Sequence, residues 1–289
     1  MTRLVTLTDG DARALVYPEQ GFQLHGFDVG PTHVVYGPRG AREPADRRYG
    51  NPVLFPSVGL TTGSRPHHWD HGGQSLQMQQ HGWARDLYWH VIENDARSIT
   101  GLLTPTNGVR VAFPFDFELR LRYSVAGPAL TLDTTIVNNG HVAFPYALGF
   151  HPYLRAPLGG TRATCAMALP QGVRLQTNDN WVTVQRSDAA ARTIMANDPE
   201  LPGSIVLADT GTRALEVVDE TARLATRVSV EDSDGSFPVW VVWSAAPEAP
   251  YVCLEPWTDY PNALNRPGTR TLAPGATQRY RMTISLHTR

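Results

Sequence analysis

The amino-acid sequence predicts an all-β protein built as a large antiparallel β-sandwich. Short runs of Val, Leu, Thr and aromatic residues recur along the chain between Gly, Pro, Asn and Asp turns, as is typical of many short strands. No segment longer than about two turns follows the 3.6-residue periodicity of an amphipathic helix. The 25 glycines and 23 prolines provide the many turns that such an architecture requires.

The strands are expected wherever β-branched and aromatic residues gather. In chain order, the clearest runs are 14–17, 34–36, 117–125, 129–137, 215–218, 239–243, 251–254 and 279–286. The run 117–125 has large apolar residues at odd positions and charged or polar residues at even positions. Because side chains alternate between the two faces of a strand, this run should bury one face. Gly127 and Pro128 follow it and predict a hairpin into the next run.

Length and composition favour a single domain over residues 1–289. The chain is 42% hydrophobic and 18% charged, which suffices for one large core, and β-sandwiches of about this size are routinely single domains. The net charge of −2 gives no electrostatic basis for binding nucleic acid or an anionic membrane. All 25 basic residues are arginine, so lysine Schiff-base chemistry is excluded.

The N-terminal segment and the cysteines favour a cytoplasmic protein. The first nine residues contain no apolar signal core, and no apolar run approaches the roughly 20 residues that a membrane span needs. Cys165 and Cys253 lack metal-like spacing, so they are most simply two free thiols, although a pairing between them stays open.

Glu255 is the first candidate for chemistry. In the run that begins at Tyr251, alternation places Tyr251, Cys253 and Glu255 on one face, and the residues between them on the core face. We expect the strand to end at Glu255, beside Pro256 and Trp257. Burial against the indole would raise the pKa of the carboxyl group and make it a better base near neutrality. The alternative is a solvated glutamate at the start of a loop.

His151 and the segment 81–86 are the next candidates. His151 follows an apolar run and precedes Pro152, so it should be held at a strand end, where an imidazole can act as an acid near neutral pH. His81 is followed by Gly82, which would allow a ligand to approach the backbone closely. Arg85 offers a fork of donors suited to oxygen-rich or phosphorylated ligands. The alternatives are a polar surface histidine and an ordinary loop.

The cluster His67-His-Trp-Asp-His71 invites a metal interpretation because it holds three imidazoles and a carboxylate. However, His67 and His68 are adjacent, and the segment lies among Gly and Pro residues that give no fixed geometry. We therefore expect a solvated loop near a cleft and assign no metal ligands.

Three motifs in order carry a family resemblance. They are His81-Gly-Trp-Ala-Arg-Asp86, Gly149-Phe-His-Pro-Tyr153, and Cys253-Leu-Glu-Pro-Trp257 with Pro261-Asn-Ala-Leu-Asn265. Together they resemble the aldose 1-epimerase (galactose mutarotase) superfamily, and the first is similar to the branch that includes hexose-6-phosphate mutarotases. The resemblance spans nearly the whole chain. It implies the galactose mutarotase-like supersandwich, with a sugar cleft across one face.

The resemblance also implies roles for individual residues. Glu255 would be the general base that takes the proton of the anomeric hydroxyl, and His151 the general acid that protonates the ring oxygen. Substrate-binding roles would fall to His81, Arg85, Trp257 and, with a poorer local match, Asp198. One departure is Leu60, because many relatives have an arginine at about this position.

The expected function is that of an aldose 1-epimerase, an isomerase that interconverts the anomers of a hexose or hexose phosphate. One acid and one base suffice for ring opening, so no metal or other cofactor is expected, and no glycine-rich loop suited to a nucleotide is evident. Two alternatives stay open. Leu60 is compatible with a non-catalytic carbohydrate-binding or sugar-sensing protein, and a glycosidase would normally need a second carboxylate. The sequence leaves open whether the protein is a monomer or a homodimer.

Overall fold

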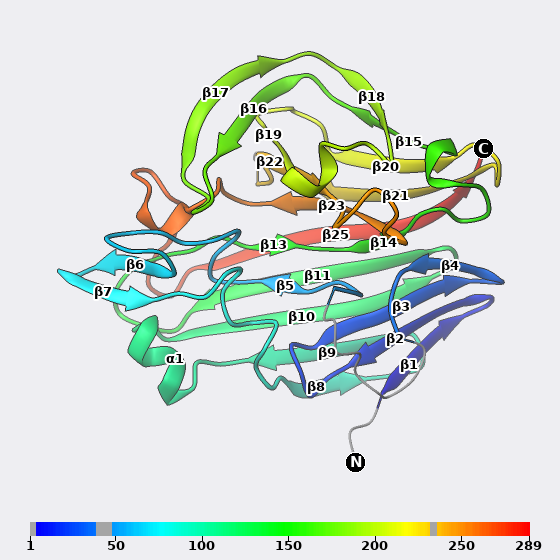
Figure 1. The fold of residues 1–289 in the computed structure, drawn as a ribbon. Coiled ribbons are helices and arrows are strands. Elements are labelled where there is room, and N and C mark those ends of the chain that lie inside the picture. The colour runs from blue at the N-terminus through cyan, green and yellow to red at the C-terminus, as the bar shows by residue number, and fades with distance from the viewer. Residues whose placement is uncertain (1–3, 39–47, 232–235) are drawn as a thin grey trace.

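The computed structural model describes residues 4–38, 48–231 and 236–289, and their regular secondary structure is almost entirely β-strand (Figure 1). Two large sheets contain most of the strands, and every strand pair in them is antiparallel. The predicted fold class is therefore confirmed. Within the described residues, no helix has the length and apolar character needed to cross a membrane.

The larger sheet has 12 strands. Its main path, in spatial order, is β1 (Val5–Asp9), β2 (Ala12–Tyr17), β3 (Gln23–Val29), β4 (Thr32–Val35), β14 (Tyr153–Arg155), β23 (Tyr251–Trp257), β22 (Val239–Trp243), β19 (Ile205–Ala208), β16 (Gly172–Thr177) and β17 (Thr183–Ala189). The short strands β13 (Gly149–Phe150) and β5 (Val53–Leu54) join it beside β23.

The second sheet has nine strands. In spatial order they are β18 (Arg192–Met195), β15 (Cys165–Leu169), β20 (Ala214–Asp219), β21 (Leu224–Glu231), β25 (Thr277–Thr288), β11 (Ala129–Asn138), β10 (Phe117–Ala126), β9 (Ser98–Leu103) and β8 (His90–Asn94). Strand β10 buries its odd positions from Phe117 to Val125, and Gly127, with φ +53°, turns it into β11. The alternation and the hairpin predicted for this segment are confirmed.

The remaining elements are short. Strands β6 (His68–His71) and β7 (Gln74–Gln77) form one hairpin, and β12 (Phe144–Pro145) pairs with β24 (Thr271–Leu272). The α-helix α1 (Asn107–Ala112) has six residues, and three 3-10 turns span Arg162–Thr164, Leu201–Gly203 and Ala263–Asn265. The expectation that no helix exceeds two turns is confirmed for the described residues.

The main core lies between the two large sheets. It joins Phe27 and Val252 of the larger sheet to Leu121, Leu132 and Ile284 of the second sheet in one cluster of buried side chains. Such burial contributes roughly 1.5–3 kcal/mol per large apolar side chain before conformational entropy is counted. The opposite face of the larger sheet carries smaller buried clusters of its own, and the candidate site lies on that face.

Candidate active site

Strand β23 divides its side chains between the core and the candidate site. Val252 and Leu254 belong to the main core, whereas Cys253 and Glu255 lie on the opposite face and are 0% and 2% exposed. The predicted assignment of faces is therefore confirmed, and the alternative of a solvated glutamate is wrong. The strand does not end at Glu255 but continues to Trp257.

Pro256 is accommodated because the neighbouring chain is interrupted there. Strand β13 pairs with Trp257 and strand β14 with the segment Tyr251–Cys253, so the chain beside β23 breaks between these two points. A proline removes a backbone donor and is tolerated where the ladder is incomplete. The break contains His151, which follows β13 directly.

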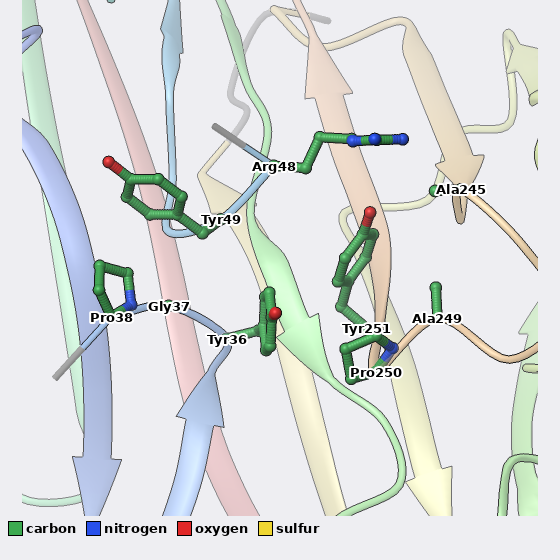
Figure 2. A pocket seen from close by; sticks show the side chains of 9 residues that line it. All are labelled: Tyr36, Gly37, Pro38, Arg48, Tyr49, Ala245, Ala249, Pro250 and Tyr251. Carbon is green, nitrogen blue, oxygen red and sulfur yellow. The ribbon is translucent and has the colours of Figure 1, made fainter. Parts of the chain in front are cut away.

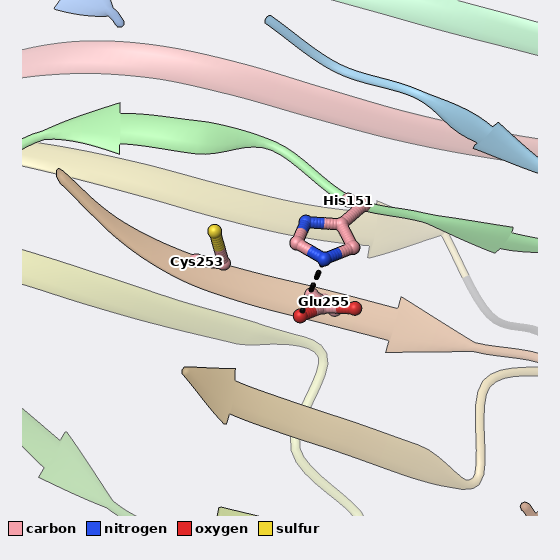
Figure 3. A group of neighbouring side chains, drawn as sticks. All are labelled: His151, Cys253 and Glu255. Atoms are coloured by element: carbon pink, nitrogen blue, oxygen red, sulfur yellow. Dashed lines mark ion pairs between the residues drawn. The ribbon is translucent and has the colours of Figure 1, made fainter. Parts of the chain in front are cut away.

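His151 lies opposite Glu255 across this break. The same register relates Gly149 to Trp257 and Tyr153 to Cys253, and its continuation sets His151 against Glu255. The His151 Nε2 atom is 3.3 Å from the Glu255 Oε1 atom, and Figure 3 marks this contact. Both residues are buried. Two groups that are 104 positions apart in the chain thus form one acid–base pair.

Trp257 orients the carboxyl group of Glu255. Its Nε1 atom donates a hydrogen bond of 3.2 Å to Glu255 Oε2, which leaves Oε1 directed at His151. Burial raises the pKa of Glu255 well above its usual value, and the indole hydrogen bond opposes this shift only in part. The sequence-based expectation of a raised carboxyl pKa agrees with this direction. Because Trp257 is fully buried, it supports Glu255 from behind and does not line the cavity.

The pKa of His151 is lowered to about 3, mainly by burial and secondarily by the positive charge of Arg85. A carboxylate facing an imidazolium would produce the opposite shifts in both groups. Burial dominates here because both side chains have lost their water. Both shifts favour the uncharged forms, that is, a protonated Glu255 carboxyl group beside a neutral His151 ring.

His81 forms a second imidazole beside the pair. Its ring centroid lies 5.6 Å from that of His151, and the Gly59 backbone N–H donates to His81 Nδ1 at 3.0 Å. The accepting role of Nδ1 assigns the proton to Nε2 in the neutral ring. Burial lowers the pKa of His81 well below its usual value, and Arg85 adds to this effect. His81 is thus suited to be a neutral hydrogen-bond donor.

Gly82 serves the protein chain, not a ligand as the sequence suggested. Its φ is +70°, and a Cβ atom at this position would lie 2.1 Å from the carbonyl oxygen of Phe55. The backbone N–H groups of Trp83 and Ala84 both donate to that same oxygen. The close approach that Gly82 permits is therefore the one that fixes the turn carrying His81.

These side chains open on a cavity of about 270 Å³. Glu255, His151, His81 and Arg85 all line it, so the fold brings four of the six predicted site residues together. The other residues that line it are Arg48, Gln80, Tyr153, Trp181, Ser204 and Trp243. One carboxylate, two imidazoles and two guanidinium groups can bind a polyhydroxylated ligand and exchange protons with it.

Asp198 does not belong to this group. It follows strand β18 at the edge of the second sheet, and its Oδ1 accepts the backbone N–H of Glu200 at 2.9 Å. It is not among the residues that line the cavity. The substrate-binding role suggested by the resemblance is therefore not supported, because the carboxylate caps a local turn instead.

A comparison with protein families places the chain. Residues 3–285 match the model of the aldose 1-epimerase family. The chain belongs to this family. The suspected resemblance is thereby confirmed.

Three relatives of this aldose 1-epimerase family member share less than 25% of its sequence. The chain is 23% identical over 244 residues to the chromosomal protein LacX of Lactococcus lactis subsp. lactis. The matched region covers 76% of this chain and 78% of LacX. The Slr1438 protein from Synechocystis sp. PCC 6803 is 24% identical with a TM-score of 0.85, covering 100% of this chain and 97% of that one. A galactose mutarotase-like protein from Lactobacillus casei ATCC 334 is 20% identical with a TM-score of 0.83, covering 99% and 100%. At these identities the structures show a common fold.

Two tryptophans in the cavity of this family member were missed by sequence reasoning. Trp243 pairs with Cys253 across β22 and β23, so strand alternation could have placed it beside the site. Trp181 comes from a turn with φ +58°, and it carried no sequence signal. Its ring packs against Gly59 and lies 5.7 Å from that of Trp257. The aromatic walls of the site thus come mainly from segments without a motif.

Figure 2 shows the residues that line a second cavity, which has a volume of about 360 Å³. Tyr36 and Tyr251 face each other in it at 5.2 Å between ring centroids, and Arg48 lines both cavities. Among the described residues that line this larger cavity there is no carboxylate or imidazole. His151 and Glu255 therefore face the smaller cavity.

The segment from His67 to His71 forms part of a hairpin, not the irregular loop that was expected. Trp69 is buried, His71 stacks on it at 4.8 Å, and the Asp70 carboxylate accepts hydrogen bonds from Ser64.

Within the parts of the chain that the structure describes, one group brings three potential metal ligands together, and it consists of His151, Cys253 and Glu255.

Proposed function

We propose that the protein is an aldose 1-epimerase that interconverts the α and β anomers of a hexose or hexose phosphate. The observation that carries this proposal is the contact of 3.3 Å between His151 Nε2 and Glu255 Oε1 at the wall of a polar cavity. The pair holds one transferable proton, and anomer exchange needs one acid and one base. Membership of the aldose 1-epimerase family supports the same reaction.

The proposed reaction follows from the proton that each member of the pair gains or loses. In the sugar complex Glu255 takes the proton of the anomeric hydroxyl, while His151 delivers a proton to the ring oxygen, and the C1–O5 bond breaks. The open aldehyde rotates about the C1–C2 bond, and the reverse proton transfers close the ring from the other face. The pair gains one proton and loses one, so it ends the cycle as it began. No covalent intermediate is needed.

The proposed roles require the shared proton to move to His151 when the sugar binds. A hydroxyl group that donates to Glu255 favours the carboxylate, because hydrogen bonds to the charged form lower a carboxyl pKa. His81, as a neutral donor, would hold a sugar oxygen in place. Arg48 and Arg85 line the same cavity and would bind ring hydroxyls or a phosphate group.

A second candidate is a non-catalytic sugar-binding protein on the same fold, and one observation favours it. Leu60 occupies the position where the family resemblance leads us to expect an arginine, and it is 8% exposed, so this position supplies no charge to the cavity. Arg48 and Arg85 provide the guanidinium groups instead. A glycosidase is less well supported, because Glu255 is the sole carboxylate among the described residues that line the cavity.

Exchange NMR on freshly dissolved α-glucose, α-galactose and glucose 6-phosphate tests the proposal. We expect acceleration with at least one sugar, and a loss of roughly 10²- to 10⁴-fold in Glu255→Gln with little change in sugar affinity. Glu248→Gln is the matched control, because Glu248 is exposed in the connection between β22 and β23. Sugar binding without acceleration would select the non-catalytic alternative.

A further inference from the structure

Three ligand atoms of different chemistry converge beside the cavity. A ring nitrogen of His151, the Sγ atom of Cys253 and a carboxylate oxygen of Glu255 all lie within 4.8 Å of one another. Cys253 and Glu255 come from one face of β23, and His151 reaches them across the break in the neighbouring chain (Figure 3). The thiol has no part in the proposed proton transfers, so its place in this group needs a separate account.

The group matches the coordination preferences of a thiophilic divalent cation. Zn²⁺ binds thiolate, imidazole and carboxylate ligands at about 2.0–2.3 Å, which puts tetrahedral ligand atoms roughly 3.3–3.8 Å apart. The His151–Glu255 separation of 3.3 Å is already close to this, and the mutual limit of 4.8 Å leaves only a small side-chain adjustment for the third ligand. Softer sulfur favours Zn²⁺ over Mg²⁺ or Ca²⁺ at such a site.

The surroundings of the group support binding as well. The three side chains are 7%, 0% and 2% exposed, so each has lost most of its competing water. The Trp257 indole holds one carboxylate oxygen of Glu255 and leaves the other directed at His151, as an outer-shell partner of a metal ligand would. The adjoining cavity of about 270 Å³, which His151 and Glu255 line, gives a path of entry.

We propose that His151, Cys253 and Glu255 form an inhibitory binding site for a divalent cation of the Zn²⁺ class. The cation forms bonds to sulfur, nitrogen and oxygen, while the thiol proton and the proton shared by His151 and Glu255 leave to solvent. No oxidation or reduction is involved. Because the cation occupies the lone pairs that must carry the transferable proton, it competes with the sugar. The inhibition rests on the proposed function, whereas the binding does not.

Cobalt absorption tests the binding without reference to activity. Protein stripped with EDTA and desalted is titrated with Co²⁺, and we expect a thiolate-to-cobalt charge-transfer band that added Zn²⁺ removes. Cys253→Ala should lose the band. Cys165→Ala is the matched control, because Cys165 is the other buried free cysteine and lies in the second sheet. Absence of the band in the unmodified protein, or its persistence in Cys253→Ala, would overturn the proposal.

Inhibition is then measured by exchange NMR at a series of Zn²⁺ concentrations. We expect Zn²⁺ to raise KM without lowering kcat, and EDTA to restore the original rate. In Cys253→Ala the inhibition constant should rise by more than about 100-fold, since losing a direct ligand should exceed the 10- to 100-fold effect of losing an outer-shell partner. Cys253→Ser nearly retains the side-chain volume, so it distinguishes loss of the sulfur ligand from a packing defect in the alanine variant.

The outcomes separate the two proposals. A cobalt band in a protein that accelerates no sugar would overturn the proposed function and leave the cation site standing. Anomer exchange that Zn²⁺ does not inhibit, or inhibits equally in Cys253→Ala, would overturn the inhibitory site and leave the proposed function standing.

Discussion

The indole Nε1 of Trp257 donates to Glu255 Oε2 at 3.2 Å, and this bond determines which carboxylate oxygen faces His151. The two residues are two positions apart in β23 and therefore lie on the same face of this strand. The orientation of the carboxyl group thus depends on a contact within β23. Trp257, which the sequence led us to expect as a sugar contact, is therefore a positioning residue for Glu255 and His151.

Trp257→Phe should therefore impair catalysis while retaining most of the packing. A hydrogen bond to a charged group contributes about 1.5–3 kcal/mol, so we expect kcat to fall roughly 10- to 100-fold. Loss of the bond should also raise the pKa of Glu255 further, because the indole opposes the effect of burial.

Trp240→Phe is the control for that experiment. Trp240 is equally buried in the adjacent strand β22, but its Nε1 donates to the Thr212 carbonyl on the core side. Exchange NMR on both variants distinguishes the effect of a misoriented Glu255 carboxyl group from the effect of lost tryptophan packing. Equal kcat values in the two variants would remove Trp257 from the mechanism.

The pH dependence of kcat/KM should be a broad bell. In the proposed mechanism, the active form of the free protein carries one proton on the pair of His151 and Glu255. Addition of a second proton to His151, whose pKa is lowered to about 3 by burial, gives the acid limb. Loss of the Glu255 proton, whose pKa is raised by burial, gives the alkaline limb. The two apparent values belong to the pair as a unit.

His151→Asn should lower kcat by roughly 10²- to 10⁴-fold and remove the acid limb, with the alkaline limb retained. Rate measurements from about pH 2.5 to pH 10, corrected for the spontaneous reaction, show which limb is lost. Loss of the alkaline limb instead would show that the proton resides on His151 in the free enzyme, as the sequence alone suggested.

Glu255→Gln should stabilise the protein at neutral and alkaline pH. The folded-state pKa of Glu255 is raised by burial, so the folded protein retains a proton that the unfolded chain releases above its own pKa of about 4.3. Stability is therefore lost as pH rises from that value towards the folded pKa, at about 1.4 kcal/mol per unit. Glutamine does not titrate and escapes this loss.

Urea unfolding of Glu255→Gln and the unmodified protein at pH 5 and pH 8 measures this effect. The free energy of unfolding of Glu255→Gln should exceed that of the unmodified protein by a larger amount at pH 8 than at pH 5. A variant that is less stable at pH 8 would indicate an ionised Glu255 paired with an imidazolium.

His25 should make the protein sensitive to acid. It is fully buried, and neither ring nitrogen has a hydrogen-bond partner among the described residues. Burial lowers the pKa of His25 to about 4. Stability is fully present above the unfolded value of about 6.5 and is lost as pH falls through about 4, by about 3 kcal/mol in total.

His25→Phe should relieve this acid sensitivity, because phenylalanine retains the ring contacts with Tyr17 and Tyr49 and does not titrate. The exposed His141 gives the control variant His141→Phe. Thermal unfolding between pH 4 and 7 should show a flatter profile for His25→Phe alone. Parallel profiles for all three proteins would contradict this assignment.

The sequence was sufficient to predict properties that are local along the chain. The alternation in 117–125 predicted which face of β10 is buried, and the same period placed Cys253 and Glu255 away from the core. A strand repeats every two residues, so its faces can be recognised within a single segment. Three short motifs were likewise enough to predict the family.

The tertiary structure decided everything that depends on strands meeting across long sequence distances. The register between β13, β14 and β23 sets His151 against Glu255. The strand order of the other sheet puts β18 at its edge, and Asp198 follows that strand. The extent to which the assembled sheets bury the pair decides that the pKa of His151 is lowered and that of Glu255 is raised, opposite to the shifts of a solvated ion pair. Pairing and desolvation are properties of the assembled sheets, because each depends on which surfaces the whole chain brings into contact.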